Sequence, residues 1–309
     1  MISPGWGHVA PASEALADHD VSRALIASGV RRDRTPDALA GDDVVVTGGS
    51  EGIGHAVAAE LTGRVRRLTL LARNADKLRR AADALRCEWL ATDVRDLSAA
   101  AADRLAGASL LVCCAGEITP GRATELAPAD YQRQMDVNFI GAVNCVAAAL
   151  PSMLARRRGT VVLVSSTAAL LGVYGYSAYG ATKAAIANYA ASLHAETAGT
   201  GVRVVVAYPP DTETPGLRRE RSLRPPETEA LAGAIAAQPA HRVARRLVDG
   251  VAAGRTRITF DATTAALIAY TGLLDRAFAA YGARKLRRLA PATTIAPHPV
   301  APLGKEDPS

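Results

Sequence analysis

Short apolar runs alternate with longer helical stretches along the middle of the chain. Each run is apolar at successive positions, which is typical of a strand buried on both faces. The six runs are "DVVVTGG" (43–49), "RLTLLAR" (67–73), "CEWLATDV" (87–94), "ASLLVCCAG" (108–116), "TVVLVSS" (160–166) and "VRVVVAYPP" (202–210). This alternation predicts an α/β fold in which helices cover both sides of a parallel sheet.

The helical stretches lie at 53–61, at 75–85 and between the third and fourth runs. A longer stretch covers 129–155, and a further helix carries Tyr179 and Lys183. Proline lacks a backbone N–H and clashes with the preceding turn, so Pro151 is expected to break or kink the long stretch.

The length and composition indicate one domain with two extensions. The chain has 309 residues, of which 49% are hydrophobic, so it can bury the core of one large α/β domain. We predict a Rossmann-type, doubly wound sheet at 41–260, because no internal repeat of fixed period divides the chain. Residues 1–40 contain several Pro and Gly breakers and form an N-terminal extension, while 261–309 form an amphipathic segment and tail.

The charge and the cysteines weigh against several classes of protein. The net charge is +6, but the arginines are scattered and aromatic residues make up only 4% of the chain. We therefore expect these arginines to lie on solvent-exposed faces and not to bind nucleic acid. The four cysteines form no C-x-x-C pair, so we expect buried free thiols in a reducing compartment and no metal site. No basic region precedes an apolar stretch at the N-terminus, so we expect a cytoplasmic protein without a secretory signal.

The sequence "TGGSEGIG" (47–54) marks the passage from the first strand to the first helix. Glycines permit a tight turn and a close approach of the backbone, and the helix start offers free N–H groups to an anion. An ordinary glycine-rich loop also fits the pattern, but the position in the first βα unit favours a dinucleotide site that binds a pyrophosphate. The candidate residues are Thr47, Gly48, Ser50, Gly52, Ile53 and Gly54.

The second strand ends in Ala72 and Arg73, where many dinucleotide sites have an acidic residue. An acidic side chain would accept hydrogen bonds from the adenosine ribose and repel a 2′-phosphate. A guanidinium can instead bind that phosphate through a forked contact. We therefore predict NADPH as the cofactor; the other interpretation is a surface arginine beside Asn74 and Lys77.

The stretch "AYGATK" (178–183) places Tyr179 and Lys183 one helical turn apart. The pair alone fits an aromatic residue beside a solvated neighbour. A free tyrosine has a pKa of about 10, and an ammonium group one turn away is expected to lower that pKa and so make the phenol a usable acid. Ser166, at the end of the fifth run, is placed to hydrogen-bond a substrate oxygen. These three side chains predict reduction of a carbonyl with Tyr179 as the acid.

The glycine spacing and these three residues resemble the short-chain dehydrogenase/reductase family over about 42–260. The resemblance implies that Asn138, in "VNFIG", completes a catalytic tetrad with Ser166, Tyr179 and Lys183. In that family an Asn at this position holds a water that relays protons to the lysine, and the tyrosine and lysine also contact the cofactor.

The same resemblance assigns residues to the rest of the cofactor. "TDV" places Asp93 and Val94 at the adenine, and "CCAG" places the backbone of Ala115 and Gly116 on the adenosine side of the cleft. Most relatives carry Asn where this chain has Cys113, so bracing of the central strand by that side chain is in doubt here.

The stretch "VAYPPDTETPG" after the sixth strand differs from most of the family, which has a Pro-Gly pair and a Thr at the nicotinamide. Here the corresponding candidates are Pro209, Thr212 and Thr214. The stretch resembles members of the family that reduce the 3-keto group of long-chain sphingoid amino ketones with NADPH. The other interpretations are reduction of another lipid, steroid or secondary-metabolite ketone, and a nonenzymatic dinucleotide sensor, which usually lacks the Tyr or the Lys.

The segment 261–289 is apolar at its start and ends in a basic cluster at 284–288. Its uncharged part is shorter than the roughly 20 residues that span a bilayer. It fits an amphipathic helix packed on the protein or on a partner subunit, and it also fits peripheral attachment to an anionic membrane. The family resemblance implies a homodimer or homotetramer.

Overall fold

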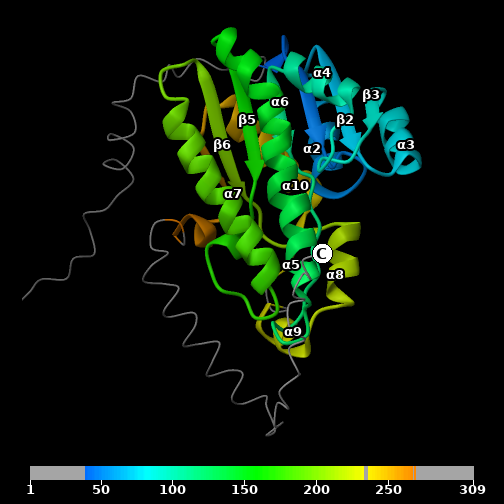
Figure 1. Cartoon of the computed structure of the whole chain (residues 1–309), viewed down its shortest axis with the longest axis vertical. Coiled ribbons are helices and arrows are strands. Elements are labelled where there is room, and N and C mark those ends of the chain that lie inside the picture. Colours follow the sequence, from blue (N-terminus) through cyan, green and yellow to red (C-terminus); the bar gives the residue numbers. More distant parts are fainter. Residues whose placement is uncertain (1–38, 233–235, 267, 269–309) are drawn as a thin grey trace, which may run out of the picture.

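The computed structural model describes residues 39–232, 236–266 and 268, and a seven-stranded parallel sheet forms the centre of this part of the chain (Figure 1). The strand order is β3-β2-β1-β4-β5-β6-β9, which is that of a doubly wound sheet. The predicted α/β fold is therefore confirmed. The strands are β1 (Asp43–Thr47), β2 (Arg67–Ala72), β3 (Glu88–Ala91), β4 (Leu110–Cys113), β5 (Gly159–Val164), β6 (Val202–Tyr208) and β9 (Arg257–Thr259).

Helices cover both faces of the sheet because the strands are apolar on both faces. On β1, Val44 and Val46 belong to one buried cluster and Val45 to the other, as expected for side chains that alternate along a strand. Among the described residues, three helices pack on each face. They are α2 (Gly52–Leu61), α3 (Ala75–Leu85) and α10 (Ala240–Ala252) on the first, and α4 (Ala99–Gly107), α6 (Gly141–Ala155) and α7 (Ser177–Glu196) on the second.

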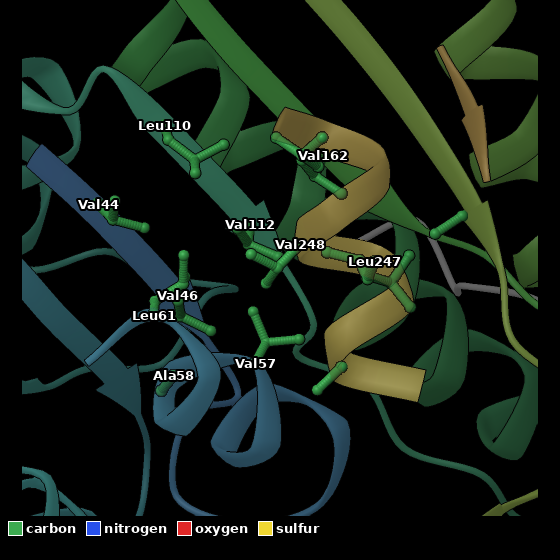
Figure 2. Close-up of a cluster of buried hydrophobic side chains, with 14 of the residues drawn as sticks. Val44, Val46, Val57, Ala58, Leu61, Leu110, Val112, Val162, Leu247 and Val248 are labelled. Carbon is green, nitrogen blue, oxygen red and sulfur yellow. The ribbon is translucent and has the colours of Figure 1, made fainter. Parts of the chain in front are cut away.

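Figure 2 shows how valines and leucines fill the first face. Side chains of β1 and β4 meet the inner sides of α2 and α10, and each is at most 2% exposed. Full burial of one such side chain contributes roughly 1.5–3 kcal/mol. The labelled residues are Val44, Val46, Val57, Ala58, Leu61, Leu110, Val112, Val162, Leu247 and Val248. This cluster fixes β1 and α2, and therefore the turn between them.

The long helical stretch departs from α geometry at an unexpected place. After α5 (Pro128–Met135), a π-helix (η2, Asp136–Ile140) leads directly into α6. The expected break at Pro151 is absent, because α6 continues to Ala155. A proline removes only one helical hydrogen bond, and Ala149 and Met153 on either side of it are fully buried against the sheet. The predicted break at Pro151 was therefore wrong, the predicted kink there stays a prediction, and the irregular turn is the one that carries Asn138.

The stretch from Pro128 to Ala155 is the one helix of the described residues that is long and apolar enough to cross a membrane. Cys145, Ala149 and Met153 are nevertheless completely buried in the core on the second face of the sheet. We therefore interpret it as a core helix.

The functional edge of the sheet is the one at which the parallel strands end. The chain leaves β1 for β2 on one side and reaches β4 on the other, so the loops after β1 and β4 diverge and open a crevice. Two short helices, α8 (Pro215–Arg221) and α9 (Pro226–Ala232), follow β6 and lie beyond this edge (Figure 1).

Three short strands were not predicted. These are β9 at the sheet edge and the parallel pair β7 (Thr212–Glu213) and β8 (Gln238–Pro239). Strands of two or three residues are too short to show an apolar pattern in the sequence.

The predicted extensions lie largely outside the described residues, and so does the basic cluster at 284–288. The described start of the C-terminal segment packs against the domain. The Asp261 carboxylate accepts a hydrogen bond from the N–H of Thr264 at 2.6 Å, and Thr264 is buried. The predicted membrane contact of 261–289 stays a prediction.

Candidate active site

A cavity of about 1510 Å³ opens at the carboxyl edge of the sheet. Most ligand sites have about 300–1,000 Å³, so this one can hold a large cofactor and a second molecule side by side. The glycine turn (47–54) and the residues after β2 line one part, which we call the cofactor end. The start of α7 and the segments after β6 line the other part, which we call the substrate end.

Backbone packing requires glycine at two positions of the glycine turn. Gly48 has a φ of 67°, and a Cβ there would lie 2.9 Å from the backbone of Ala115. A Cβ on Gly54 would lie 2.4 Å from the carbonyl oxygen of Gly48. No side chain in the described part of the chain caps α2, whose first residues line the cavity. Its N–H groups remain available to an anion, and the turn therefore fits the pyrophosphate of a dinucleotide.

Thr47 supports the cofactor end without lining it. Its Oγ1 accepts hydrogen bonds from the N–H groups of Cys114 and Ala115, each at 3.1 Å, and it is 1% exposed. These bonds join the ends of β1 and β4 and place the backbone of Ala115 and Gly116 on the cavity wall. Cys113 is buried among the helices of the second face, so the strand ends are joined here by Thr47.

Basic side chains surround the far part of the cofactor end. Arg73 lines the cavity with its guanidinium 3.6 Å from Glu117 and 4.0 Å from Asp93, and more than half of its side chain is exposed. Lys77 also lines the cavity and contacts Glu51 at 3.2 Å. Both cations face the space beyond β2, where a ribose phosphate would lie, which fits a 2′-phosphate.

Tyr179 and Ser166 form the floor of the substrate end. Ser166 follows β5 and precedes a short 3₁₀ helix (η3, Thr167–Ala169), and it lies close enough to Tyr179 to lower the pKa of that phenol. Burial raises the pKa of Tyr179, while the Ser166 hydrogen bond lowers it and nearby carboxylates raise it further. The lowered pKa expected from the sequence is therefore wrong for the protein by itself, because desolvation outweighs the other influences.

Lys183 lies on the same side of α7 as Tyr179. Its ammonium is 5.6 Å from the centre of the Tyr179 ring and donates a hydrogen bond to the carbonyl of Val164 at 3.1 Å. The side chain is buried, and this desolvation lowers its pKa to about 8. Near neutral pH the group is therefore mostly charged, in position to stabilise negative charge on the tyrosine.

Asn138 positions its neighbours and does not line the cavity. Its side-chain oxygen accepts from the N–H of Glu117 at 2.7 Å, and its amide nitrogen donates to the carbonyl of Glu117 and to Thr182, both at 2.9 Å. This buried amide therefore connects the π-helix, the loop after β4 and the start of α7. The water-holding role implied by the family stays a prediction.

Most of the predicted residues come together in this cavity. Asp93 is not on its wall, because its carboxylate is paired with Arg95 at 2.7 Å, which lowers the pKa of Asp93. Its predicted contact with adenine is untested. The predicted residues on the wall are Gly48, Ser50, Gly52, Ile53, Gly54, Arg73, Val94, Ala115, Gly116, Ser166, Tyr179, Lys183, Pro209, Thr212 and Thr214.

The sequence did not reveal a charged cluster behind the substrate end. Arg224 is buried and contacts Glu220 at 2.5 Å, Asp211 at 2.8 Å and Glu229 at 3.5 Å. Tyr176 donates a hydrogen bond to Glu220, and its ring lies edge-on to Tyr179 with centroids 5.9 Å apart. Glu220, Arg224 and Glu229 lie in an aperiodic, charged stretch that is typical of a solvent-exposed segment. Asp211 belongs to the stretch "VAYPPDTETPG", but the sequence showed no sign of its charged partners.

Arg219 is exposed, as expected for a solvated arginine, but it has a further contact that the sequence did not reveal. It lies on the cavity wall and pairs with Glu51 of the glycine turn. It thereby joins α8 to the cofactor end.

The match to a family model agrees with this geometry. The model for short chain dehydrogenases matches residues 42–224. The chain belongs to the short-chain dehydrogenase/reductase family, and it is an oxidoreductase that interconverts a ketone and an alcohol with a nicotinamide dinucleotide.

Several curated relatives are similar over most of the chain. The 3-ketodihydrosphingosine reductase of Bos taurus is 35% identical over 71% of this chain and 71% of its own length. The 3-dehydrosphinganine reductase of Danio rerio is 33% identical over 73% of each. The 3-dehydrosphinganine reductase TSC10B of Arabidopsis thaliana is 34% identical over 70% of this chain and 69% of its own.

Solved structures share the fold. A short chain dehydrogenase/reductase family protein superposes with a TM-score of 0.65 at 26% identity, covering 72% of this chain and 97% of its own. The closed form of a serine dehydrogenase complexed with NADP+ has a TM-score of 0.63 at 24% identity, covering 70% of this chain and 93% of its own.

Proposed function

We propose that this enzyme reduces 3-ketodihydrosphingosine to dihydrosphingosine with NADPH. The observation that carries the proposal is the placement of Ser166, Tyr179 and Lys183 at the floor of one cavity with separate cofactor and substrate ends. The names of three relatives that match about 70% of the chain support the sphingoid substrate.

The side chains divide the proton chemistry among them. Bound NADPH supplies the hydride that adds to the carbonyl carbon. Tyr179 donates its phenol proton to the carbonyl oxygen, and Ser166 hydrogen-bonds the same oxygen. The raised pKa of Tyr179 keeps it as a phenol, the form that can donate. The Lys183 ammonium then stabilises the phenolate that remains.

The apolar wall of the substrate end supports a long-chain substrate. Leucine and valine side chains from the loop after η3, from α8 and from α9 line it, and Leu223 between those two helices is 58% exposed. Burial of an alkyl chain against this wall stabilises its binding by about 0.8 kcal/mol for each CH₂ group removed from water. The lining residues of this kind are Leu171, Val173, Leu217, Leu223 and Leu231.

Arg73 and Lys77 support the choice of NADPH. Each carries a positive charge to the cofactor end, where only NADPH has a phosphate on the adenosine ribose. The end of β2 has no acidic residue, and an acidic residue there would favour NADH.

Consumption of NADPH in the presence of ketones tests the proposal. The purified chain is given 3-ketodihydrosphingosine, a steroid ketone and a simple aliphatic ketone, and products are identified by mass spectrometry. We expect the sphingoid ketone to have the highest kcat/KM. Preference for another ketone would assign the enzyme to a different substrate, and binding of NADPH without reduction of any ketone would indicate a sensor.

A further inference from the structure

Two carboxylates at the substrate end have no role in the chemistry described so far. Asp211 follows β6 and Glu220 lies on α8, and both line the cavity together with Tyr176 and Tyr179. Tyr176 connects Glu220 to the reaction centre, because its hydroxyl is bonded to Glu220 and its ring contacts Tyr179 edge-on. We call Asp211 and Glu220 the acidic pair.

The countercharge of the acidic pair lies outside the cavity. Arg224 is not on the cavity wall, and its side chain is 1% exposed. It contacts Oδ2 of Asp211 and Oε1 of Glu220, while no hydrogen bond within the described residues occupies Oδ1 of Asp211 or Oε2 of Glu220. Neither of these oxygens is among the buried polar atoms that lack a partner. Both residues line the cavity, which brings these two oxygens within reach of a molecule bound there.

The cluster also has more negative than positive charge. Asp211, Glu220 and Glu229 share the single guanidinium of Arg224, so two formal negative charges are uncompensated within it. At the cofactor end the acids are matched: Glu51 contacts both Lys77 and Arg219, and Glu117 contacts Arg73 and Arg133. The acidic pair therefore differs from the acids of the cofactor end.

The acidic pair acts on the reaction centre as well. Both carboxylates raise the pKa of Tyr179, so each lies close enough to affect it electrostatically. A cation bound between the pair and Tyr179 would cancel this effect and make the phenol a stronger acid.

We propose that Asp211 and Glu220 bind a protonated amino group on the carbon next to the reacting carbonyl, so that the enzyme selects α-amino ketones over plain ketones. The inference rests on the proposed function, since it assumes that a ketone binds at Ser166 and Tyr179. An ammonium group offers three N–H donors and can contact both free carboxylate oxygens at once.

The test compares two water-soluble ketones of equal chain length, one with and one without the α-amino group. Their kcat/KM ratio is measured for the wild type and for Asp211→Asn, in the presence of NADPH. We expect the wild type to favour the amino ketone, and Asp211→Asn to reduce that preference on the order of tenfold to hundredfold, the usual effect of one hydrogen bond to a charged group. Reduction of both ketones with equal kcat/KM by the wild type would overturn the inference but not ketone reduction itself.

Glu229→Gln is the matched control. Glu229 also contacts Arg224, at 3.5 Å, but it is not on the cavity wall. If loss of an Arg224 partner were the cause, the ratio would change in both variants, whereas recognition of the amine changes it only in Asp211→Asn. An equal change in the two variants would contradict the inference.

Binding provides a readout that does not need turnover. A long-chain 2-amino-3-alcohol and the same alcohol without the amine are titrated into the protein with NADP+ by calorimetry. We expect tighter binding of the amine, with the difference reduced in Asp211→Asn and in Glu220→Gln. Equal affinities in the wild type would refute recognition of the amine even if every ketone failed to react, a failure that would separately refute the proposed function.

Discussion

The two ends of the cavity differ in what shapes them: backbone packing at the cofactor end and side chains at the substrate end. At the cofactor end backbone packing shapes the glycine turn: glycines 48 and 54 allow close packing, and Thr47 joins two strands through backbone N–H groups. At the substrate end the wall is made of side chains from α7 and from segments after β6. A wall of backbone restricts the residue types along a short stretch, whereas a wall of side chains depends on how distant segments meet.

The largest expected effect comes from the junction of the two ends. Tyr179→Phe should lower kcat on the order of 10²–10⁴-fold, because it removes the proton donor and keeps the ring. NADPH affinity, measured by fluorescence, should stay nearly unchanged. Tyr189→Phe on the same helix is the control, since Tyr189 packs in the core away from the cavity. A Tyr179→Phe enzyme with full activity would refute the assigned mechanism.

The cofactor end should not tolerate a methyl group added to Gly54. In Gly54→Ala the new Cβ would overlap the Gly48 carbonyl, and overpacking costs about 1–3 kcal/mol, so NADPH affinity should fall roughly tenfold to hundredfold. Gly107→Ala is the control, because nothing lies within 4 Å of its added Cβ. Thermal unfolding of both variants separates a local effect from loss of the fold. Unchanged NADPH affinity in a folded Gly54→Ala protein would contradict the backbone description of this end.

Arg73 tests whether the cofactor end also uses side-chain charge. Arg73→Gln should weaken NADPH binding about tenfold and leave NADH binding almost unchanged, because only NADPH carries the 2′-phosphate. Arg79→Gln, an exposed arginine on α3 outside the cavity, should change neither. Equal losses for the two cofactors would show that Arg73 has no role in recognising the phosphate.

The pH dependence should report the buried lysine. Burial lowers the pKa of Lys183 to about 8, so its ammonium form is present below that pH and is lost above it. Reduction should therefore slow as the pH rises through about 8, by up to about tenfold per pH unit. Lys183→Met should be slow at all pH values and lack this decline. A wild-type rate that stays flat well beyond pH 8 would indicate that the ammonium is not required.

The same contrast explains what the sequence allowed us to predict. Gly48, Gly54 and the Tyr179–Lys183 pair follow strands or lie on one helix, so local spacing was sufficient to place them together. Asp211, Glu220 and Arg224 come from a loop and a short helix without periodicity, and their partners depend on the three-dimensional packing of that segment. The pKa of Tyr179 was misjudged for a related reason: burial is a property of the whole fold, and the spacing to Lys183 could not reveal it.

Transfer of deuterium tests the central claim most directly. The enzyme is given 3-ketodihydrosphingosine and NADPH deuterated at the transferable position of the nicotinamide ring, and the product is analysed by mass spectrometry. The account predicts dihydrosphingosine with one deuterium on the former carbonyl carbon, formed by the wild type and by Tyr189→Phe but at most in traces by Tyr179→Phe. Unchanged ketone after incubation with the wild type, or a product without deuterium at that carbon, would contradict it.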